Sequence, residues 1–175
     1  MNSRFANKTT EEIRLEARRD VDAVLDVHWD GSIPVDPFEL ATRLGPEVYT
    51  AQLGDDVYGL ITGPPHNAQI YLDVDQSPNR MRFSCAHELG HYVDRSSTID
   101  VNPGDFAKID KRSDSGARTP PEVYANEFAA ALLMPTKKVH EFHRQGMTNV
   151  EMANRFRVSL DALKWRLVNL GLAQR

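Results

Sequence analysis

The sequence predicts an α+β fold in which helices pack against a small antiparallel sheet. Apolar residues recur at helical spacing before residue 45 and again after residue 77. Between these segments, from Val48 to Val74, the period changes to that of strands, with Gly-Asp and Gly-Pro-Pro interruptions. The chain has 175 residues, 41% of them hydrophobic and 26% charged. This size and balance suit one ordinary globular domain with a small appendage.

The first helix is expected over Thr9–Trp29, because a threonine can cap it and apolar residues form one stripe along it. The stripe consists of Ile13, Ala17, Val21, Val24, Leu25 and His28. The segment Ile33-Pro34-Val35 is expected to be extended, since a residue before proline avoids the helical region. Asp36 then caps a short helix that Gly45 and Pro46 end.

Three strands and two longer helices are expected next. The strand candidates are Val48–Thr50, Tyr58–Ile61 and Gln69–Leu72. A helix is predicted over Ser77–Val93 and another over Glu122–Met134, where Pro135 stops it, with a short helix from Thr136. The segment Asp94–Pro121 between them is polar and long for a loop, and such loops are usually functional or mobile.

The end of the chain, from Thr148 onward, has the pattern of a helix, a turn and a second helix. Thr148 and Glu151 form a capping box, Ser159 caps the last helix and Gly171 ends it. Residues 148–175 include five basic and two acidic side chains, for a local charge near +3. One interpretation is contact with DNA through Lys164, Arg166 or Asn169. The favoured interpretation is that these helices close the core or dock the substrate, because two short helices lack the third helix against which DNA-binding versions normally pack.

Charge and cysteine content limit the compartment and the partners. The net charge is -4 and the pI about 5.9, so no overall basic field indicates nucleic acid. Cys85 is alone, which excludes an internal disulfide and favours a reducing compartment. Met1–Arg14 has no apolar core of a signal peptide, and Phe128–Met134 is too short to span a bilayer. We therefore expect a cytoplasmic protein without a membrane partner.

Residues 87–91 form an H-E-x-x-H motif inside a predicted helix. His87 and His91 are four residues apart, so both imidazoles lie on one helix face and can reach one zinc ion at about 2.0–2.1 Å. Glu88 lies beside that face, where its carboxylate could act as the general base toward a water activated by zinc. The motif therefore predicts a zinc peptidase. The alternative interpretation is two core histidines next to an exposed glutamate.

A catalytic zinc needs a third protein ligand, and the later helix offers two glutamates. Glu122 shares a helix face with small residues that would let two helices pack closely. Glu127 points about 140° away from Glu122 at 100° per residue. Glu122 is the favoured ligand, although an acidic residue in a first turn also complements the helix dipole. Zinc is the expected metal, with manganese or iron as alternatives.

Three segments of the sequence together resemble the ImmA/IrrE family of zinc metallopeptidases. The first is Ile33–Ala41, the second is Arg82–His91, and the third is Glu122–Pro135, which is similar to E-x-x-A-N-x-F-A-x-x-L-L-M-P. The segments occur in the family's order and span most of the chain from Ile33 on. The resemblance implies a compact α+β peptidase core, which we expect over residues 1–145, followed by the helix-turn-helix-like segment over 146–175 that the local pattern predicts. It also implies Glu122, not Glu127, as the third ligand.

The resemblance further implies an endopeptidase that cleaves helix-turn-helix transcriptional repressors and so relieves repression of stress-response or mobile-element genes. The alternative is a regulatory module that binds a repressor or DNA without cleaving it, with a structural zinc. Glu88 favours the enzyme, because a purely structural zinc would not need that carboxylate.

Further candidates surround the motif. Asp94, seven residues after His87, could orient a ligating imidazole, and Tyr92 could polarise a substrate, although helix ending and packing are the plainer roles. His140 and His143 form H-x-x-H and could stabilise a transition-state oxyanion, or simply lie on a surface helix. Cys85 is expected to be a buried structural thiol.

Overall fold

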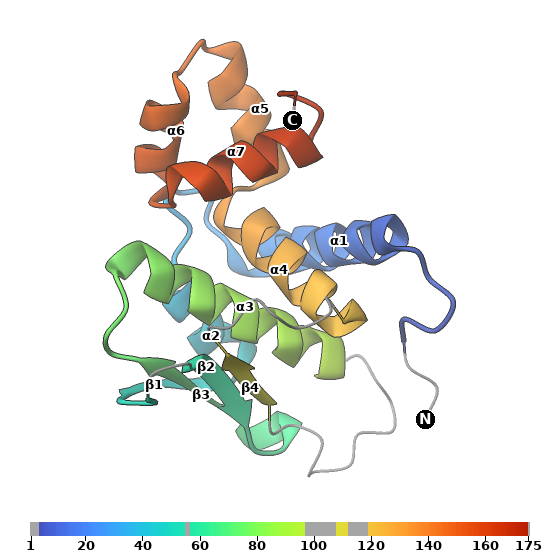
Figure 1. Ribbon diagram of the computed structural model, residues 1–175, viewed down its shortest axis with the longest axis vertical. Coiled ribbons are helices and arrows are strands. Elements are labelled where there is room, and N and C mark those ends of the chain that lie inside the picture. Colours follow the sequence, from blue (N-terminus) through green and yellow to red (C-terminus); the bar gives the residue numbers. More distant parts are fainter. Residues whose placement is uncertain (1–3, 55–56, 97–107, 112–118, 175) are drawn as a thin grey trace.

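The fold places its helices on one face of a sheet and at one end of the molecule (Figure 1). A computed structural model of the protein describes residues 4–54, 57–96, 108–111 and 119–174. The elements in chain order are α1 Thr10–His28, α2 Pro37–Leu44, β1 Glu47–Ala51, β2 Val57–Thr62, a 3-10 turn Pro65–Asn67, β3 Gln69–Asp73, α3 Pro78–Ser96, β4 Lys108–Lys111, α4 Pro120–Leu133, α5 Thr136–Arg144, α6 Asn149–Phe156 and α7 Leu160–Asn169. The α+β class is therefore confirmed.

The sheet has four strands in the order β1-β3-β2-β4, and it is mixed rather than antiparallel. β3 pairs antiparallel with β2 but parallel with β1, where Tyr49 faces Tyr71 across the pair. The prediction of an antiparallel sheet was therefore wrong for this pair. The reason is that β3 returns from a hairpin with β2 and inserts between β2 and β1, which gives it the direction of β1.

β4 was not predicted, because it lies within the segment expected to be a loop. Its backbone pairs antiparallel with β2, from Val57 opposite Lys111 to Ile61 opposite Lys108. α3 extends to Ser96 and so includes Asp94, which had been expected to begin the loop. The remaining loop residues, 97–107 and 112–118, lie outside the described residues, and so does any test of their role at the site.

Helix α3 lies between the sheet and the other long helices. It packs against β2 and β3 on one side and against α4 on the other, and α4 in turn packs against α1 (Figure 1). Gly90 lets α3 and α4 pack closely, because a Cβ placed there would lie 3.0 Å from Ala125 Cα. Side chains from all these elements form one buried core that includes Ile13, Ile61, Leu72, Leu89 and Phe128.

The last three helices lie at the opposite end of the molecule from the sheet (Figure 1). Thr148 and Glu151 form the predicted capping box at α6, Arg157 takes a left-handed conformation at its end, and Ser159 caps α7. The interpretation of α6 and α7 as a helix-turn-helix, and the division at residues 145 and 146, stay predictions.

Arg166 on α7 faces the interior. It is 1% exposed and donates to Glu127 on α4 at 3.0 Å, to the Met134 carbonyl at 3.2 Å and to the Thr136 hydroxyl at 3.1 Å. Arg166 is therefore buried and not placed to touch DNA, so the less favoured interpretation, contact with DNA, is wrong for this residue. Lys164 on the same helix is exposed. None of the helices in the described part of the chain combines the length and the apolar character needed to cross a bilayer.

Candidate metal centre

The H-E-x-x-H residues lie in the middle of α3, where the helix is buried between the sheet and α4. His87 is 3% exposed and His91 is 1% exposed, and their rings lie edge to face with centroids 4.7 Å apart. Both side chains come from one helix face, because four residues make slightly more than one turn. The helical spacing therefore brings the two imidazoles together as the motif predicts.

Glu122 reaches the same point from the first turn of α4. Its Oε2 lies 3.4 Å from His87 Nε2 and its Oε1 lies 3.3 Å from His91 Nε2, while the two Nε2 atoms are 3.1 Å apart. Ligand atoms from these three residues all lie within 4.8 Å of one another. The Glu122 side chain is 25% exposed, whereas both histidines are buried.

The spacing of the three donors fits a zinc ion. Donors at about 2.0–2.1 Å from a tetrahedral zinc lie about 3.3–3.4 Å from one another. The two Nε2 atoms are 3.1 Å apart, and each has a Glu122 oxygen at 3.3 or 3.4 Å, although the two imidazoles contact different oxygens of that carboxylate. These contacts are close to that edge length. Two imidazoles and one carboxylate are also a donor set that catalytic zinc uses, with the fourth position left for water or substrate. The residues present therefore fit the metal that the motif implies.

Glu88 is buried beside the cluster and lies against strand β2. It is 1% exposed, and a Cβ placed on Gly59 would lie 3.1 Å from its Oε1 and 3.4 Å from its Cγ. Gly59 thus provides the space for the Glu88 side chain between α3 and the sheet. Gly59 was not predicted to lie at the site, although a glycine inside a strand pattern is a known sign of close approach by another group.

Glu127, the competing ligand, lies on a different face of α4. It is 4% exposed, and its carboxylate accepts hydrogen bonds from the guanidinium groups of Arg18 at 2.7 Å and Arg166 at 3.0 Å. It is not part of the cluster, which agrees with the expected angle between the two glutamates. Glu127 instead joins α4 to α1 and α7.

Asp94 and Tyr92 are engaged by parts of the chain distant in sequence. Asp94 Oδ1 accepts from Arg4 at 3.4 Å, and burial raises the pKa of its carboxyl, although the Arg4 charge opposes that rise. The Tyr92 hydroxyl donates to the Leu44 carbonyl at 3.2 Å, next to the end of α2. Roles in orienting an imidazole or polarising a substrate stay predictions for these two residues.

His140 and His143 lie on α5 and are not members of the cluster formed by described residues. His143 is exposed and His140 is half-buried. Their proposed role toward an oxyanion stays a prediction. Cys85 is fully buried, and burial raises the pKa of its thiol, as expected for a structural cysteine.

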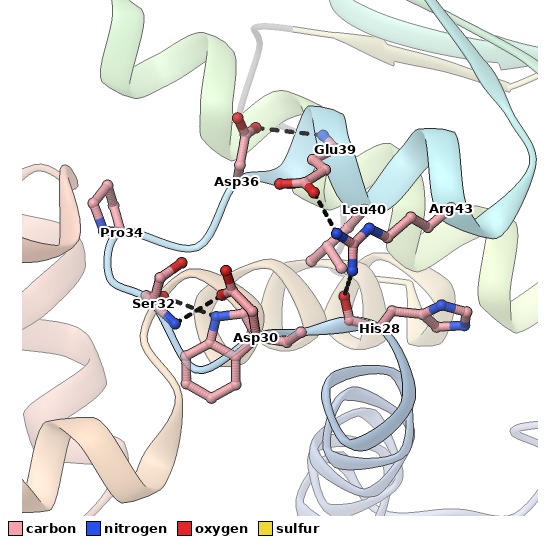
Figure 2. A pocket seen from close by; sticks show the side chains of 9 residues that line it. His28, Asp30, Ser32, Pro34, Asp36, Glu39, Leu40 and Arg43 are labelled. Carbon is pink, nitrogen blue, oxygen red and sulfur yellow. Dashed lines mark hydrogen bonds and ion pairs between the residues drawn. The ribbon is translucent and has the colours of Figure 1, made fainter.

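A hollow lies around the segment that connects α1 to α2 (Figure 2). Its polar groups are largely engaged with one another, since Arg43 donates to the His28 carbonyl at 2.6 Å and the Trp29 indole donates to the Ser32 carbonyl at 2.8 Å. None of the residues that line it is one of the three candidate metal ligands, His87, His91 and Glu122. We assign this hollow no role in the chemistry.

Comparison with known proteins identifies the family. The model of the IrrE N-terminal-like domain, a metallopeptidase family, matches residues 41–168. A solved structure described as a Mycobacterium tuberculosis transcriptional regulator is similar with a TM-score of 0.61 and 17% identity, over 90% of this chain and 51% of that chain. At that identity the likeness shows the fold alone, and this chain spans about half of that one. No curated protein matches the sequence.

The family match includes all four residues of the candidate centre and far more than half of the chain. The chain therefore belongs to the IrrE N-terminal-like domain family of metallopeptidases.

Proposed function

We propose that the protein is a zinc-dependent endopeptidase in which His87, His91 and Glu122 hold the ion and Glu88 moves the proton. The observation that carries the proposal is the convergence of two buried imidazoles and one carboxylate, with closest contacts of 3.1 to 3.4 Å between the groups, which is a donor set that one zinc ion uses. A purely structural zinc would not need the buried carboxylate of Glu88 beside it.

The chemistry follows from the placement of Glu88. Zinc, when bound, acidifies a water and polarises the carbonyl of the peptide bond to be cut. Glu88 takes the proton from the attacking water and then gives it to the amine nitrogen, while a C–O bond forms and the C–N bond breaks. Support for this role is that Glu88 follows His87 directly on α3 and that its side chain is buried against Gly59.

For the substrate we propose a helix-turn-helix transcriptional repressor in the cytoplasm. Two lines support this. The three sequence segments resemble a family whose substrates are such repressors, and a protein of similar fold is described as a transcriptional regulator. Cleavage would relieve repression of stress-response or mobile-element genes. The single cysteine of the chain fits a reducing compartment.

The test is co-expression of the chain with the helix-turn-helix repressor encoded next to it. We expect cleavage by the wild type and none by Glu88→Gln, which removes the base and keeps the size of the side chain. Glu141→Gln is the matched control, since Glu141 lies on α5 and is 39% exposed. Mass spectrometry of the products identifies the bond, and zinc content is measured for each variant.

Three results are informative. Cleavage that requires both Glu88 and metal supports the peptidase. Cleavage that persists in Glu88→Gln would refute the proposed role of that carboxylate. A stable complex with the repressor, with full zinc content but no cleavage, would favour a regulatory module that binds without cutting.

A further inference from the structure

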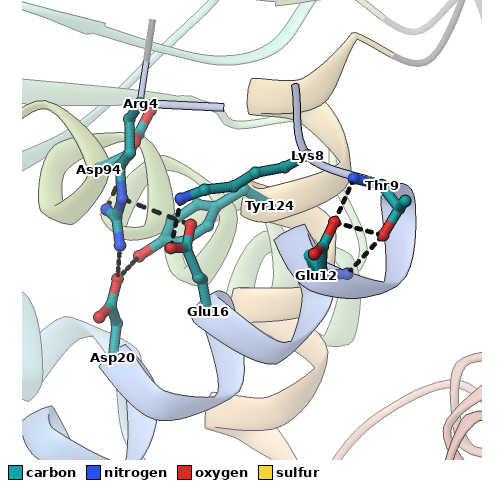
Figure 3. A network of polar contacts seen from close by, with 8 residues as sticks. All are labelled: Arg4, Lys8, Thr9, Glu12, Glu16, Asp20, Asp94 and Tyr124. Carbon is teal, nitrogen blue, oxygen red and sulfur yellow. Dashed lines mark hydrogen bonds and ion pairs between the residues drawn. The ribbon is translucent and has the colours of Figure 1, made fainter. Parts of the chain in front are cut away.

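Arg4, near the N-terminus, contacts three helices at once (Figure 3). Its guanidinium donates to Asp20 on α1 at 2.5 Å and to Asp94 on α3 at 3.4 Å. It also lies 5.0 Å from the ring centroid of Tyr124 on α4. The next residue, Phe5, is 4% exposed and packs on the same tyrosine with centroids 5.5 Å apart. The segment that carries Arg4 is thus part of the core and does not lie loosely on its surface.

The contacts of Arg4 lie close to the proposed metal ligands. Asp94 follows His91 by three residues on α3, and Tyr124 follows Glu122 by two residues on α4. At 1.5 Å per residue these separations are about 4.5 Å and about 3 Å along the helix axes. Arg4 therefore connects α3 and α4 within one turn of a ligand on each helix.

A further attachment between α3 and α4 matters because the two helices carry different ligands of the same proposed ion. The helices pack closely at Gly90, where a Cβ would lie 3.0 Å from Ala125 Cα and 3.1 Å from Phe128 Cβ. A change in the angle between the helices would separate His91 from Glu122. Metal sites need their ligands held within about 0.5 Å and 10–20°. A contact to both helices away from Gly90 restrains that angle.

Charge adds to this effect. Asp20 accepts from both Arg4 and the Tyr124 hydroxyl, so α1 and α4 share one carboxylate with the guanidinium (Figure 3). Glu16 on α1 lies 3.8 Å from Arg4 Nε. Loss of the Arg4 charge would remove the cation that lies between Asp20 and Asp94, and their repulsion would favour a different arrangement of α1 and α3.

We propose that Arg4 is a positioning residue for the metal centre: by contacting Asp94 on α3 and Tyr124 on α4, it keeps His91 and Glu122 directed at one ion. The inference rests on the proposed function, because it assumes that these residues bind a metal.

The experiment measures metal binding by the full chain without any substrate. Zn²⁺ is titrated in competition with a chromophoric chelator, and Co²⁺ absorption reports the coordination geometry. Arg4→Gln removes the charge and keeps a hydrogen-bonding group, whereas Arg4→Lys restores the charge. Arg18→Gln is the matched control. Arg18 has the same exposed fraction as Arg4, 20%, and its pair with Glu127 also joins α1 to α4, away from the ligands.

We expect Arg4→Gln to raise the dissociation constant for zinc about tenfold, the size of effect seen when groups that orient metal ligands are removed. The Co²⁺ spectrum should weaken with it, and Arg4→Lys should recover part of both. Arg18→Gln should bind zinc as the wild type does, even where its thermal stability is lower.

Unchanged zinc affinity in Arg4→Gln would overturn the inference. Equal loss in Arg18→Gln would overturn it too, because the effect would then be general loosening of the fold. If Arg4→Gln does not fold, Arg4→Lys and Arg18→Lys are compared in the same way. A wild type that binds no zinc refutes the proposed function itself, whereas a wild type that binds zinc regardless of Arg4 refutes only this inference.

Discussion

Gly90 occupies a position where any side chain would meet the backbone of α4. A Cβ there would lie 3.0 Å from Ala125 Cα and 3.1 Å from Phe128 Cβ. Backbone atoms of a packed helix cannot turn aside as a flexible side chain can. The absence of a side chain at Gly90 therefore sets the distance between the helices that carry His91 and Glu122.

Gly90→Ala tests this spacing. Overpacking of this kind destabilises a protein by about 1–3 kcal/mol. Alanine offsets part of this, because it favours the helix by about 1 kcal/mol relative to glycine. We expect the free energy of unfolding to fall by up to about 2 kcal/mol, with weaker zinc binding, measured by urea denaturation and metal titration. Asn79→Ala, at the exposed start of α3, is the control and should change stability by less than about 0.5 kcal/mol. A more stable Gly90→Ala would show that α4 moves aside without cost.

Residues of the centre differ in how far the sequence could predict them. His87, Glu88 and His91 are fixed by spacing within one helix, so a local pattern is enough to bring them together. Identifying Glu122 as the third ligand required the longer E-x-x-A-N motif, because Glu122 lies 31 residues after His91 and spacing alone did not exclude Glu127. Arg4 and Gly59 were missed, since their roles depend on contacts across the fold that leave no local pattern.

At the scale of elements, α7 is joined to α4 by a buried ion pair. Arg166 donates a hydrogen bond to Glu127, and the Glu127 carboxylate also accepts a hydrogen bond from Arg18 on α1. Burial lowers the pKa of Arg166 to about 10, while the Glu127 charge opposes that change, so the guanidinium stays charged at neutral pH. Helices α1, α4 and α7 therefore meet at one carboxylate.

Removing Arg166 should be costly. Breaking a buried pair by deleting one partner costs about 3–5 kcal/mol, and Arg18 still partners Glu127, so we expect Arg166→Leu to lose about 3 kcal/mol in chemical denaturation. Lys164→Ala, at a side chain that is 57% exposed, should stay within about 0.5 kcal/mol of the wild type. Similar small losses in both variants would mean that the pair contributes little to holding α7.

Elements with local signals were predicted well, and those that depend on pairing were not. Thr9 caps α1 and Thr148 caps α6. Such caps are predictable because a capping box involves only four consecutive residues. β4 has no apolar run to reveal it and is recognised only by its pairing with β2. The burial of Arg166 could have been read from its place beside Leu163 and Leu167 on the apolar face of α7, but charge suggested the surface.

At the scale of the whole molecule, zinc should stabilise the fold, because its ligands come from two helices that unfolding would separate. A ligand at one hundred times its dissociation constant adds about 2.7 kcal/mol. For a chain of this size we expect the melting temperature to rise by about 5–10 °C with zinc and to fall back with a chelator. His91→Ala should abolish the difference, as measured by differential scanning calorimetry. A zinc-dependent rise that survives in His91→Ala would place the ion elsewhere.

The packing of the half-buried Arg4 and the buried Phe5 against the helices has a practical consequence for purification of the protein. An affinity tag fused a few residues ahead of Arg4 would pull on a segment that three helices hold, whereas Ala173 and Gln174 at the other end are exposed. Recombinant protein with an uncleaved N-terminal tag could then load poorly with metal and pass for an inactive enzyme. The tag belongs at the C-terminus, and its position should be recorded with every measured zinc content.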